Sequence, residues 1–225
     1  KKGIWKNMDL WSLYKKAQTP FDWHYEAFNL ARRKNINLIS TPFSIRSLNF
    51  LKKFNPPVYK ISSFEITDLK LVYEIAKLRK PIILSTGLAS IREIKDSLNI
   101  INKFHNKVIL MYCVSGYPTP NEEVNLNTII EFKKEFPKNL IGLSDHTNSV
   151  ESCLASIPFG IVAFEKHFKL NEKLISPDSK FSISVEKMKQ LNSQKKLFFT
   201  FLGKKKKVLK KSEKESLIFR RSIFS

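Results

Sequence analysis

Two histidines, each following an apolar run, are the residues with the clearest chemical potential. Leu140–Leu143 leads directly into Ser144-Asp145-His146, and Ile161–Phe164 leads into Glu165-Lys166-His167. Uncharged runs that end in polar clusters predict buried parallel strands that deliver their last residues into a site. Because neutral imidazole binds divalent ions well, the pair predicts a metal site. Two hydrogen-bonded structural histidines remain the alternative, since His-x-x-x-His spacing is absent.

The alternation of side chains along a strand sorts these polar residues by face. A period of two places Gly142, Ser144 and His146 together, and it places Glu165 beside His167. We therefore expect both histidines to project from the ends of their strands toward one common region.

Lys60 is the second candidate, because it lies in the segment 58–63, which follows Pro56-Pro57 and also predicts a buried strand. An unpaired ammonium inside a barrel costs roughly several kcal/mol, so Lys60 needs an anion. Glu65, just beyond the strand, and a bound phosphate or carboxylate both satisfy this need. Neutral hydroxyl donors at the strand ends could surround the same anion: Thr41, Ser63, Ser85, Ser115 and Ser144.

Two loops carry further candidates. The segment 114–120 contains two prolines and one glycine, which predicts a stiff loop that holds Tyr117 over the mouth of the site. The segment 174–182 offers Asp178 as a lid carboxylate. A simple Pro-Asp turn explains Asp178 equally well.

The elements that position these residues alternate regularly. Residues 1–19 predict a loop with a short helix. Strands are expected over 37–43, 58–63, 81–87, 108–113, 141–146 and 161–167, and helices over 20–34, 45–54, 68–79, 90–104, 125–136, 150–157 and 184–201. Thr19 is expected to cap the first of these helices with Pro20 as its first residue, Asp68 to cap another, and Ser90 with Glu93 to form a capping box.

This alternation predicts a (β/α)₈ barrel of TIM type rather than a doubly wound sheet. Polar groups end nearly every strand, as in a barrel, and no Gly-x-Gly-x-x-Gly loop is present. About six βα units are recognisable where a complete barrel has eight, so we expect an incomplete barrel that corresponds to strands three to eight.

The composition limits the remaining possibilities. A net charge of +20 suggests nucleic-acid binding, but most lysines are scattered singly and only Lys204–Lys207 and Lys210-Lys211 form a block. A solvated lysine-rich surface is the preferred interpretation, without a nucleic-acid partner. No apolar run is long enough for a membrane span, and neither Cys113 nor Cys153 belongs to a CxxC pair. We therefore expect a reduced, cytoplasmic protein without a membrane partner.

Seven ordered motifs resemble the sialic acid synthase family, and they are Ser40-Thr41-Pro42-Phe43, Tyr59-Lys60-Ile61-Ser62-Ser63-Phe64-Glu65, Ile83-Leu84-Ser85-Thr86-Gly87, Tyr117-Pro118-Thr119-Pro120, Gly142-Leu143-Ser144-Asp145-His146-Thr147, Glu165-Lys166-His167-Phe168 and Pro177-Asp178. Members of this family condense phosphoenolpyruvate with an acetamido sugar on a (β/α)₈ barrel. Phe64-Glu65-Ile66-Thr67-Asp68 and the segment 13–24 resemble the pseudaminic acid branch, whose sugar is a 2,4-diacetamido-trideoxy hexose. The neuraminate and legionaminic acid branches remain alternatives.

The resemblance implies a role for each matching residue. His146 and His167 match ligands of a divalent metal, manganese or magnesium. The implied catalytic residues are Lys60, Glu65, His146, His167 and Asp178. The implied substrate-binding residues are Thr41, Lys60, Ser63, Ser85, Ser115, Tyr117 and Ser144.

The resemblance also implies what this chain does not contain. Family members begin with two βα units that carry a functional glutamate and lysine, and they end in an antifreeze-like domain that reaches into a partner subunit. We therefore expect residues 1–203 to form a partial barrel, residues 204–225 to form a basic linker, and the full-length protein to be a homodimer. A truncated, inactive remnant or an interaction module is the alternative from another class.

Overall fold

The fold is built on a curved parallel sheet. A computed structural model describes residues 9–220, and within that range the sheet has five strands in the order β1-β2-β3-β4-β5, each parallel to its neighbour. The strands are β1 (Tyr59–Ile61), β2 (Ile82–Ser85), β3 (Val108–Cys113), β4 (Leu140–Asp145) and β5 (Phe164–Lys166). The prediction for residues 1–8 lies outside the described residues.

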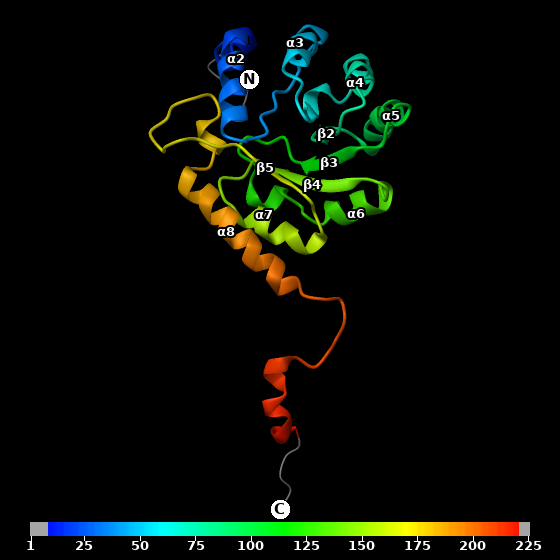
Figure 1. Ribbon diagram of the computed structural model, residues 1–225, viewed down its shortest axis with the longest axis vertical. Coiled ribbons are helices and arrows are strands. Elements are labelled where there is room, and N and C mark those ends of the chain that lie inside the picture. Colours follow the sequence, from blue (N-terminus) through cyan, green and yellow to red (C-terminus); the bar gives the residue numbers. More distant parts are fainter. Residues whose placement is uncertain (1–8, 221–225) are drawn as a thin grey trace, which may run out of the picture.

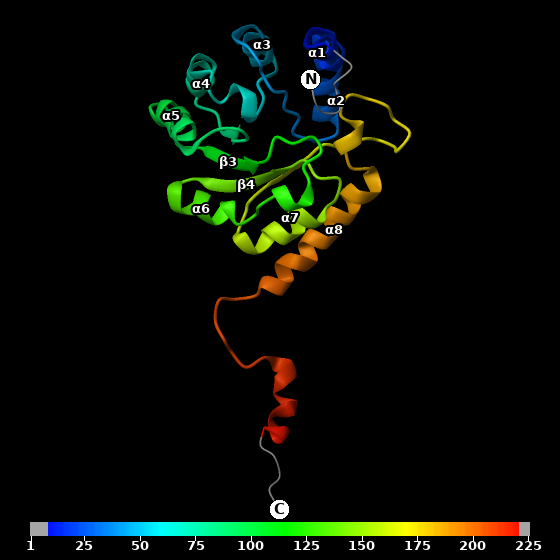
Figure 2. The same ribbon diagram turned by 180° about the vertical axis from the view of Figure 1, so that it is seen from behind.

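Helices precede, connect and follow the strands, and they cover the outside of the sheet. They are α1 (Leu10–Ala17), α2 (Phe21–Arg33), α3 (Ile45–Leu51), α4 (Leu69–Ala76), α5 (Ile91–Asn102), α6 (Thr128–Glu135), α7 (Glu151–Ser156) and α8 (Val185–Leu202). Figures 1 and 2 show helices α2 to α8 following one another around an arc, with the strands enclosed by it. Right-handed βα units in succession produce this curled half-barrel, which confirms the predicted (β/α) barrel class.

Local signals explain where several helices begin. Ser90 and Glu93 form the expected capping box at the start of α5, and Asp68 accepts a hydrogen bond from the Leu71 amide at the start of α4. The expected cap at the start of α2 is wrong, because Pro20 rather than Thr19 occupies the N-cap position and provides no side-chain bond.

The strand register assigns every residue to one of two faces. Tyr59, Ile82 and Leu84 point to the helices and are buried, and they join one continuous apolar core with α4 and α5. The alternate residues face the concave side of the sheet. Gly142 lies there opposite Met111, whose sulfur occupies the space of a side chain at that position.

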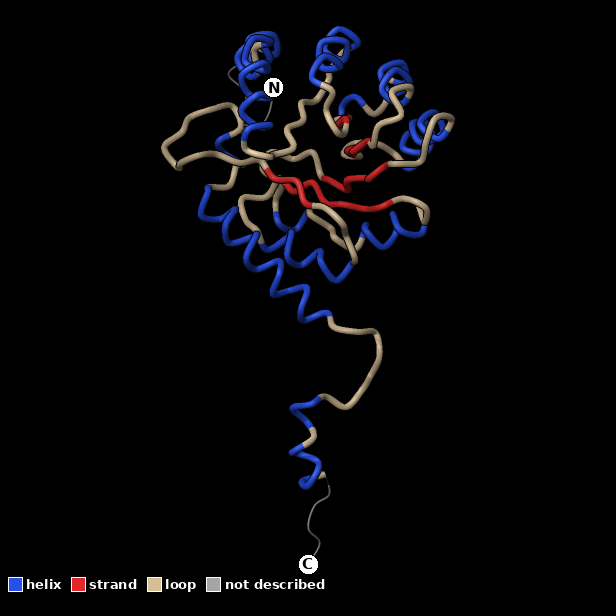
Figure 3. Tube along the Cα trace, in the orientation of Figure 1, coloured by secondary structure: helices blue, strands red, loops and turns tan. Residues whose placement is uncertain are grey.

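One predicted strand is absent. Residues 37–43 form no ladder, because none of the strand pairings within residues 9–220 includes them, and β1 is left as the edge of the sheet. His24 anchors this segment instead, since its Nε2 lies 3.0 Å from Ser40 Oγ while its Nδ1 donates to the Pro20 carbonyl. Figure 3 shows the segment as a loop beside the sheet.

Beyond α8 the chain leads away from the sheet (Figure 1), with short 3₁₀ helices over Lys211–Glu213 and Glu215–Phe219. The division at residue 203 stays a prediction, and residues 221–225 lie outside the described part. None of the helices between residues 9 and 220 is long and apolar enough to cross a membrane.

Candidate active site

An ion pair across the concave side joins the two edges of the sheet. Lys60 Nζ in β1 lies 3.3 Å from Glu165 Oε1 in β5, although these strands are the outermost in the sheet order. The curl of the sheet therefore brings its two edges together over the inner face. Only 8% of the Lys60 side chain is exposed, so its charge requires a partner.

The partner of Lys60 differs from the carboxylate considered first. Glu65 forms a hydrogen bond with the Ser62 hydroxyl, and Glu165 takes the ion pair. Burial works against ionisation of Glu165, but the Lys60 ammonium and the hydrogen bonds to it outweigh burial and lower the Glu165 pKa. Lys60 retains donor capacity for a second anion, because an ammonium has three donors.

A compact polar cluster lies next to this ion pair. The Gly87 amide donates to Ser63 Oγ at 3.1 Å and to Cys113 Sγ at 3.1 Å, and these two side chains are 3.2 Å apart. Gly87 is required here: a Cβ at this position would lie 2.2 Å from Ser115 Oγ. Three loops that follow β1, β2 and β3 thus meet at one point.

Buried hydroxyl groups near this cluster lack protein partners. Within the described residues, the oxygens of Ser85 and Ser115 are buried and make no hydrogen bond of normal geometry, although Ser115 lies close enough to the Tyr117 phenol to act on the Tyr117 pKa. A buried polar atom without a partner costs about 1–3 kcal/mol, which is unusual in a native structure unless a ligand or water supplies the bond. Ser85, at the end of β2, shares the concave face with Lys60.

The two predicted histidines lie side by side at the ends of β4 and β5. Their ring centroids are 5.4 Å apart. His146 Nδ1 donates to the Val114 carbonyl at 2.8 Å, and His167 Nδ1 lies 3.5 Å from Asp178 Oδ2. Burial lowers the pKa of His146, so this imidazole is neutral at pH 7.

This geometry fits a shared divalent ion. Imidazoles that bind one ion through nitrogens about 2.1 Å away have centroids roughly 4.5–5.5 Å apart. Histidine ligands usually donate their other ring nitrogen to a carbonyl or carboxylate, which is the arrangement of both Nδ1 atoms here. No group of three or more His, Cys, Asp or Glu suitable for a metal occurs in the part of the chain that the structure describes, so water or substrate oxygens would complete the coordination.

The loop after β3 covers the imidazole pair as expected. The Tyr117 ring lies 4.4 Å from the His146 ring and 6.1 Å from the His167 ring, centroid to centroid. The loop is fixed by the Thr119 amide, which donates to the His146 carbonyl, and the Tyr117–Pro118 bond is cis. Burial raises the pKa of Tyr117 to about 12, so the phenol keeps its proton at neutral pH.

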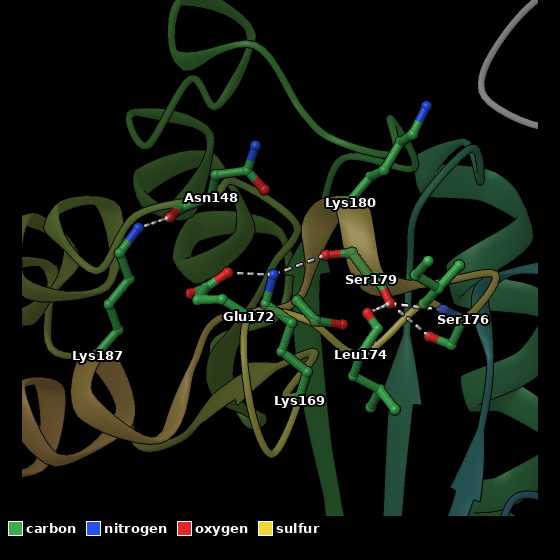
Figure 4. A pocket seen from close by; sticks show the side chains of 10 residues that line it. Asn148, Lys169, Glu172, Leu174, Ser176, Ser179, Lys180 and Lys187 are labelled. Atoms are coloured by element: carbon green, nitrogen blue, oxygen red, sulfur yellow. Dashed lines mark hydrogen bonds and ion pairs between the residues drawn. The ribbon is translucent and has the colours of Figure 1, made fainter.

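Asp178 lies on a loop between β5 and α8 that is held by its own hydrogen bonds. Ser179 Oγ donates to the Leu174 carbonyl at 2.6 Å, and Lys169 pairs with Glu172 (Figure 4). This loop, the start of α8 and Asn148 line an open pocket of about 480 Å³. None of the predicted site residues lines that pocket, so the structure separates it from the imidazole pair.

Two candidates form no hydrogen bond or ion pair with another candidate in the described part of the chain. Thr41 is half-buried on the unpaired segment, and no hydrogen bond between residues 9 and 220 joins it to another candidate. Glu65 is in the short 3₁₀ helix after β1, where burial raises its pKa. Lys60, Ser63, Ser85, Ser115, Tyr117, Ser144, His146 and His167 all lie at the carboxyl end of the sheet.

The chain belongs to the NeuB family, whose model matches residues 1–207. It is 37% identical over 223 residues to the pseudaminic acid synthase of Helicobacter pylori, covering 98% of this chain and 65% of that protein. It is 35% identical over 215 residues to the N,N'-diacetyllegionaminic acid synthase of Campylobacter jejuni, covering 94% of this chain and 64% of that protein. The chain therefore spans about two thirds of the length of these relatives.

A solved structure gives the same result for the fold. The N-acetylneuraminic acid (sialic acid) synthetase from Leptospira borgpetersenii, in complex with citrate, superposes with a TM-score of 0.85 at 30% identity. The match covers 93% of this chain and 73% of that chain. The predicted resemblance to the sialic acid synthases is thus confirmed at the level of the family.

Three residues of the site were missed as candidates. The period of two puts Glu165 on the face of His167 without assigning it to the site, and the sequence predicts Gly87 and Cys113 only as the last residues of their strands. The available signal was the period of two, which puts Cys113 on the face of Ser115. Their contacts are with residues 24 or more positions away, which no local pattern reveals.

Proposed function

We propose that this chain carries the barrel site of an enzyme that condenses phosphoenolpyruvate with an acetamido sugar to give a nonulosonic acid and phosphate. One observation carries the proposal: a buried lysine, buried serine hydroxyls and a pair of adjacent imidazoles converge at the carboxyl end of a barrel sheet in a NeuB-family chain. This is the end at which barrel enzymes place their chemistry.

In this proposal the polar cluster holds the anionic substrate. Lys60 provides a charged donor, while Ser63, Ser85 and Ser115 provide neutral donors for phosphate and carboxylate oxygens. The orphaned hydroxyls of Ser85 and Ser115 support this assignment, because a bound anion would satisfy both. Ser144, between Cys113 and Glu165 in the register, and Thr41 would complete the contacts.

The imidazole pair faces the second substrate. A manganese or magnesium ion held by His146 and His167 would act as a Lewis acid on the aldehyde oxygen of the open-chain sugar. Tyr117 covers the pair and limits the entry of water, and Asp178 orients His167 through Nδ1. Both roles require that the residues be rigid, which the loop hydrogen bonds provide.

The reaction balances with water as the only further reactant, which supplies the oxygen at carbon 2 and the proton taken by the former aldehyde oxygen. Carbon 3 of phosphoenolpyruvate attacks the aldehyde carbon, whose oxygen takes a proton. Water adds to the oxocarbenium-like carbon 2, and phosphate leaves by cleavage of the carbon–oxygen bond. Glu65 and Glu165 provide negative charge beside the centre where positive charge develops.

For the sugar, we favour the 2,4-diacetamido-trideoxy hexose of the pseudaminic acid branch. The supporting features are the sequence Phe64-Glu65-Ile66-Thr67-Asp68 and Ser115, which stands where neuraminate synthases commonly have asparagine. Identities of 37% and 35% to synthases of two different products do not separate the branches. A homodimeric assembly, a cytoplasmic location and the absence of nucleic-acid and membrane partners stay predictions.

The test uses the full-length gene product that carries this chain. Phosphate release is measured with phosphoenolpyruvate, manganese and each of three sugars: the 6-deoxy-altrose-type bis-acetamido sugar, 2,4-diacetamido-2,4,6-trideoxymannose and N-acetylmannosamine. We expect turnover with the first. Turnover only with the second or third assigns the chain to the legionaminic acid or neuraminate branch, and no sugar-dependent release contradicts the proposal.

A further inference from the structure

A buried ion pair on the helix side of the sheet joins β4 to β5 immediately before the two histidines. Asp145 Oδ2 and Lys166 Nζ are 3.0 Å apart, and their side chains are 2% and 1% exposed. The two residues are register partners. Since their neighbours Ser144 and Glu165 face the concave side, this pair lies outside the substrate cluster.

Both side chains of the pair form several further hydrogen bonds. The Asp145 carboxylate accepts from the Thr147 amide at 2.9 Å, the Thr147 hydroxyl at 3.2 Å, the Cys153 thiol at 3.3 Å and the Ser152 hydroxyl. Lys166 also donates to the Thr147 carbonyl at 2.6 Å. Ser152 and Cys153 belong to α7, so the network ties both strands to that helix.

Stability alone does not account for this network. Replacing a buried ion pair with apolar residues of similar volume is often neutral or stabilising, because both charges lose their hydration on burial. The contacts themselves suggest another role. Lys166 binds the residues on both sides of His146, namely Asp145 and Thr147, and Lys166 directly precedes His167.

We propose that the Asp145–Lys166 pair is a positioning element that sets the separation and orientation of the two imidazoles for a shared divalent ion. Neither residue touches substrate or the ion. The inference rests on the metal site of the proposed function, and it adds the reason why two charged residues occupy buried positions behind that site. Its expected effect is that of residues around metal ligands, about 10- to 100-fold in metal affinity.

The test removes both charges together, in the full chain. In the Asp145→Leu/Lys166→Met double variant no unpaired charge remains buried, so the protein should stay folded. The matched control is Leu143→Val, which disturbs the same ladder on the same face two residues before Asp145. Affinity for manganese is measured by electron paramagnetic resonance titration, and folding by circular dichroism and thermal unfolding.

We expect the double variant to lose about 10- to 100-fold in manganese affinity, while Leu143→Val lowers the melting temperature and leaves the affinity within about threefold of the native value. Native affinity in a folded double variant overturns the inference. If the double variant does not fold, Lys166→Arg takes its place, because it keeps the charge and changes only the donor geometry.

A metal-free readout separates this inference from the proposed function. The His146 Nδ1 proton, which bonds to the Val114 carbonyl, is observed by ¹⁵N-edited NMR. We expect its resonance to shift or broaden in the double variant and to persist in Leu143→Val. If the native protein binds no manganese, the metal proposal fails, and an unchanged His146 resonance in the double variant then overturns the positioning role as well.

Discussion

Replacing Gly87 with alanine tests whether the polar cluster is a binding site. Gly87 does not have the left-handed backbone conformation, so alanine fits its φ and ψ. Its new Cβ, however, would lie 2.2 Å from Ser115 Oγ, 2.9 Å from Cys113 Sγ and 3.0 Å from Ser63 Oγ. These three side chains must move, and the substitution thereby fills the space in which we place the anion.

The magnitude follows from these contacts. Overpacking of this kind costs about 1–3 kcal/mol of stability, which a folded domain tolerates. A hydrogen bond to a charged ligand contributes about 1.5–3 kcal/mol. Misplacing one of the hydroxyl donors should therefore weaken phosphoenolpyruvate binding about 10- to 100-fold, since about 1.4 kcal/mol corresponds to a factor of ten.

Isothermal titration with phosphoenolpyruvate measures this effect, and urea unfolding reports stability in parallel. Gly116→Ala is the matched control, because a Cβ there meets its nearest neighbour, the Thr119 Cα, at 3.4 Å. We expect Gly116→Ala to bind phosphoenolpyruvate like the native protein. Equal affinity of native protein and Gly87→Ala would refute the placement of the anion in this cluster.

Three further predictions concern the imidazole pair, the carboxylate after β1 and the packing of the concave face. His146→Ala should reduce manganese affinity by more than the roughly 10- to 100-fold typical of residues around metal ligands. Electron paramagnetic resonance titration measures this affinity, and an unchanged value would exclude His146 as a ligand. Burial raises the pKa of Glu65 above its usual value of 4.5, so its contribution to stability is lost as pH rises through the folded pKa. Glu65→Gln should therefore gain stability relative to the native protein between pH 4.5 and pH 8 in urea unfolding, and a constant difference across this range would contradict the assignment. Gly142→Ala, whose Cβ would lie 2.4 Å from Met111 Sδ, should cost about 1–3 kcal/mol in the same assay; a smaller loss would mean that Met111 moves aside freely.

The strand–helix alternation could be predicted because each element carries a local signal. The strand 108–113 was placed with its observed bounds, and the capping box of Ser90 and Glu93 begins α5 as expected. The prediction of a strand over 37–43 was wrong for a non-local reason. The composition of the segment suits a strand, but a strand also requires a hydrogen-bonded neighbour, and no strand within residues 9–220 pairs with this segment.

The candidate site was predictable in its faces but not in its contacts. A period of two correctly placed Ser144 with His146 and Glu165 with His167. The same period could not identify Glu165 as the partner of Lys60, because this contact depends on how strongly the whole sheet curls. The sequence could not predict the burial of the Asp145–Lys166 pair either, since that burial depends on α7 covering the other face of the sheet.

The most direct test of the central claim follows the bridging oxygen of phosphoenolpyruvate. The full-length gene product is incubated with manganese, the bis-acetamido sugar and phosphoenolpyruvate that carries ¹⁸O between carbon 2 and phosphorus. Condensation with carbon–oxygen cleavage predicts that the label appears in the released phosphate and that the release depends on the sugar. Label retained in the organic product, or phosphate released without the sugar, would contradict the assigned reaction.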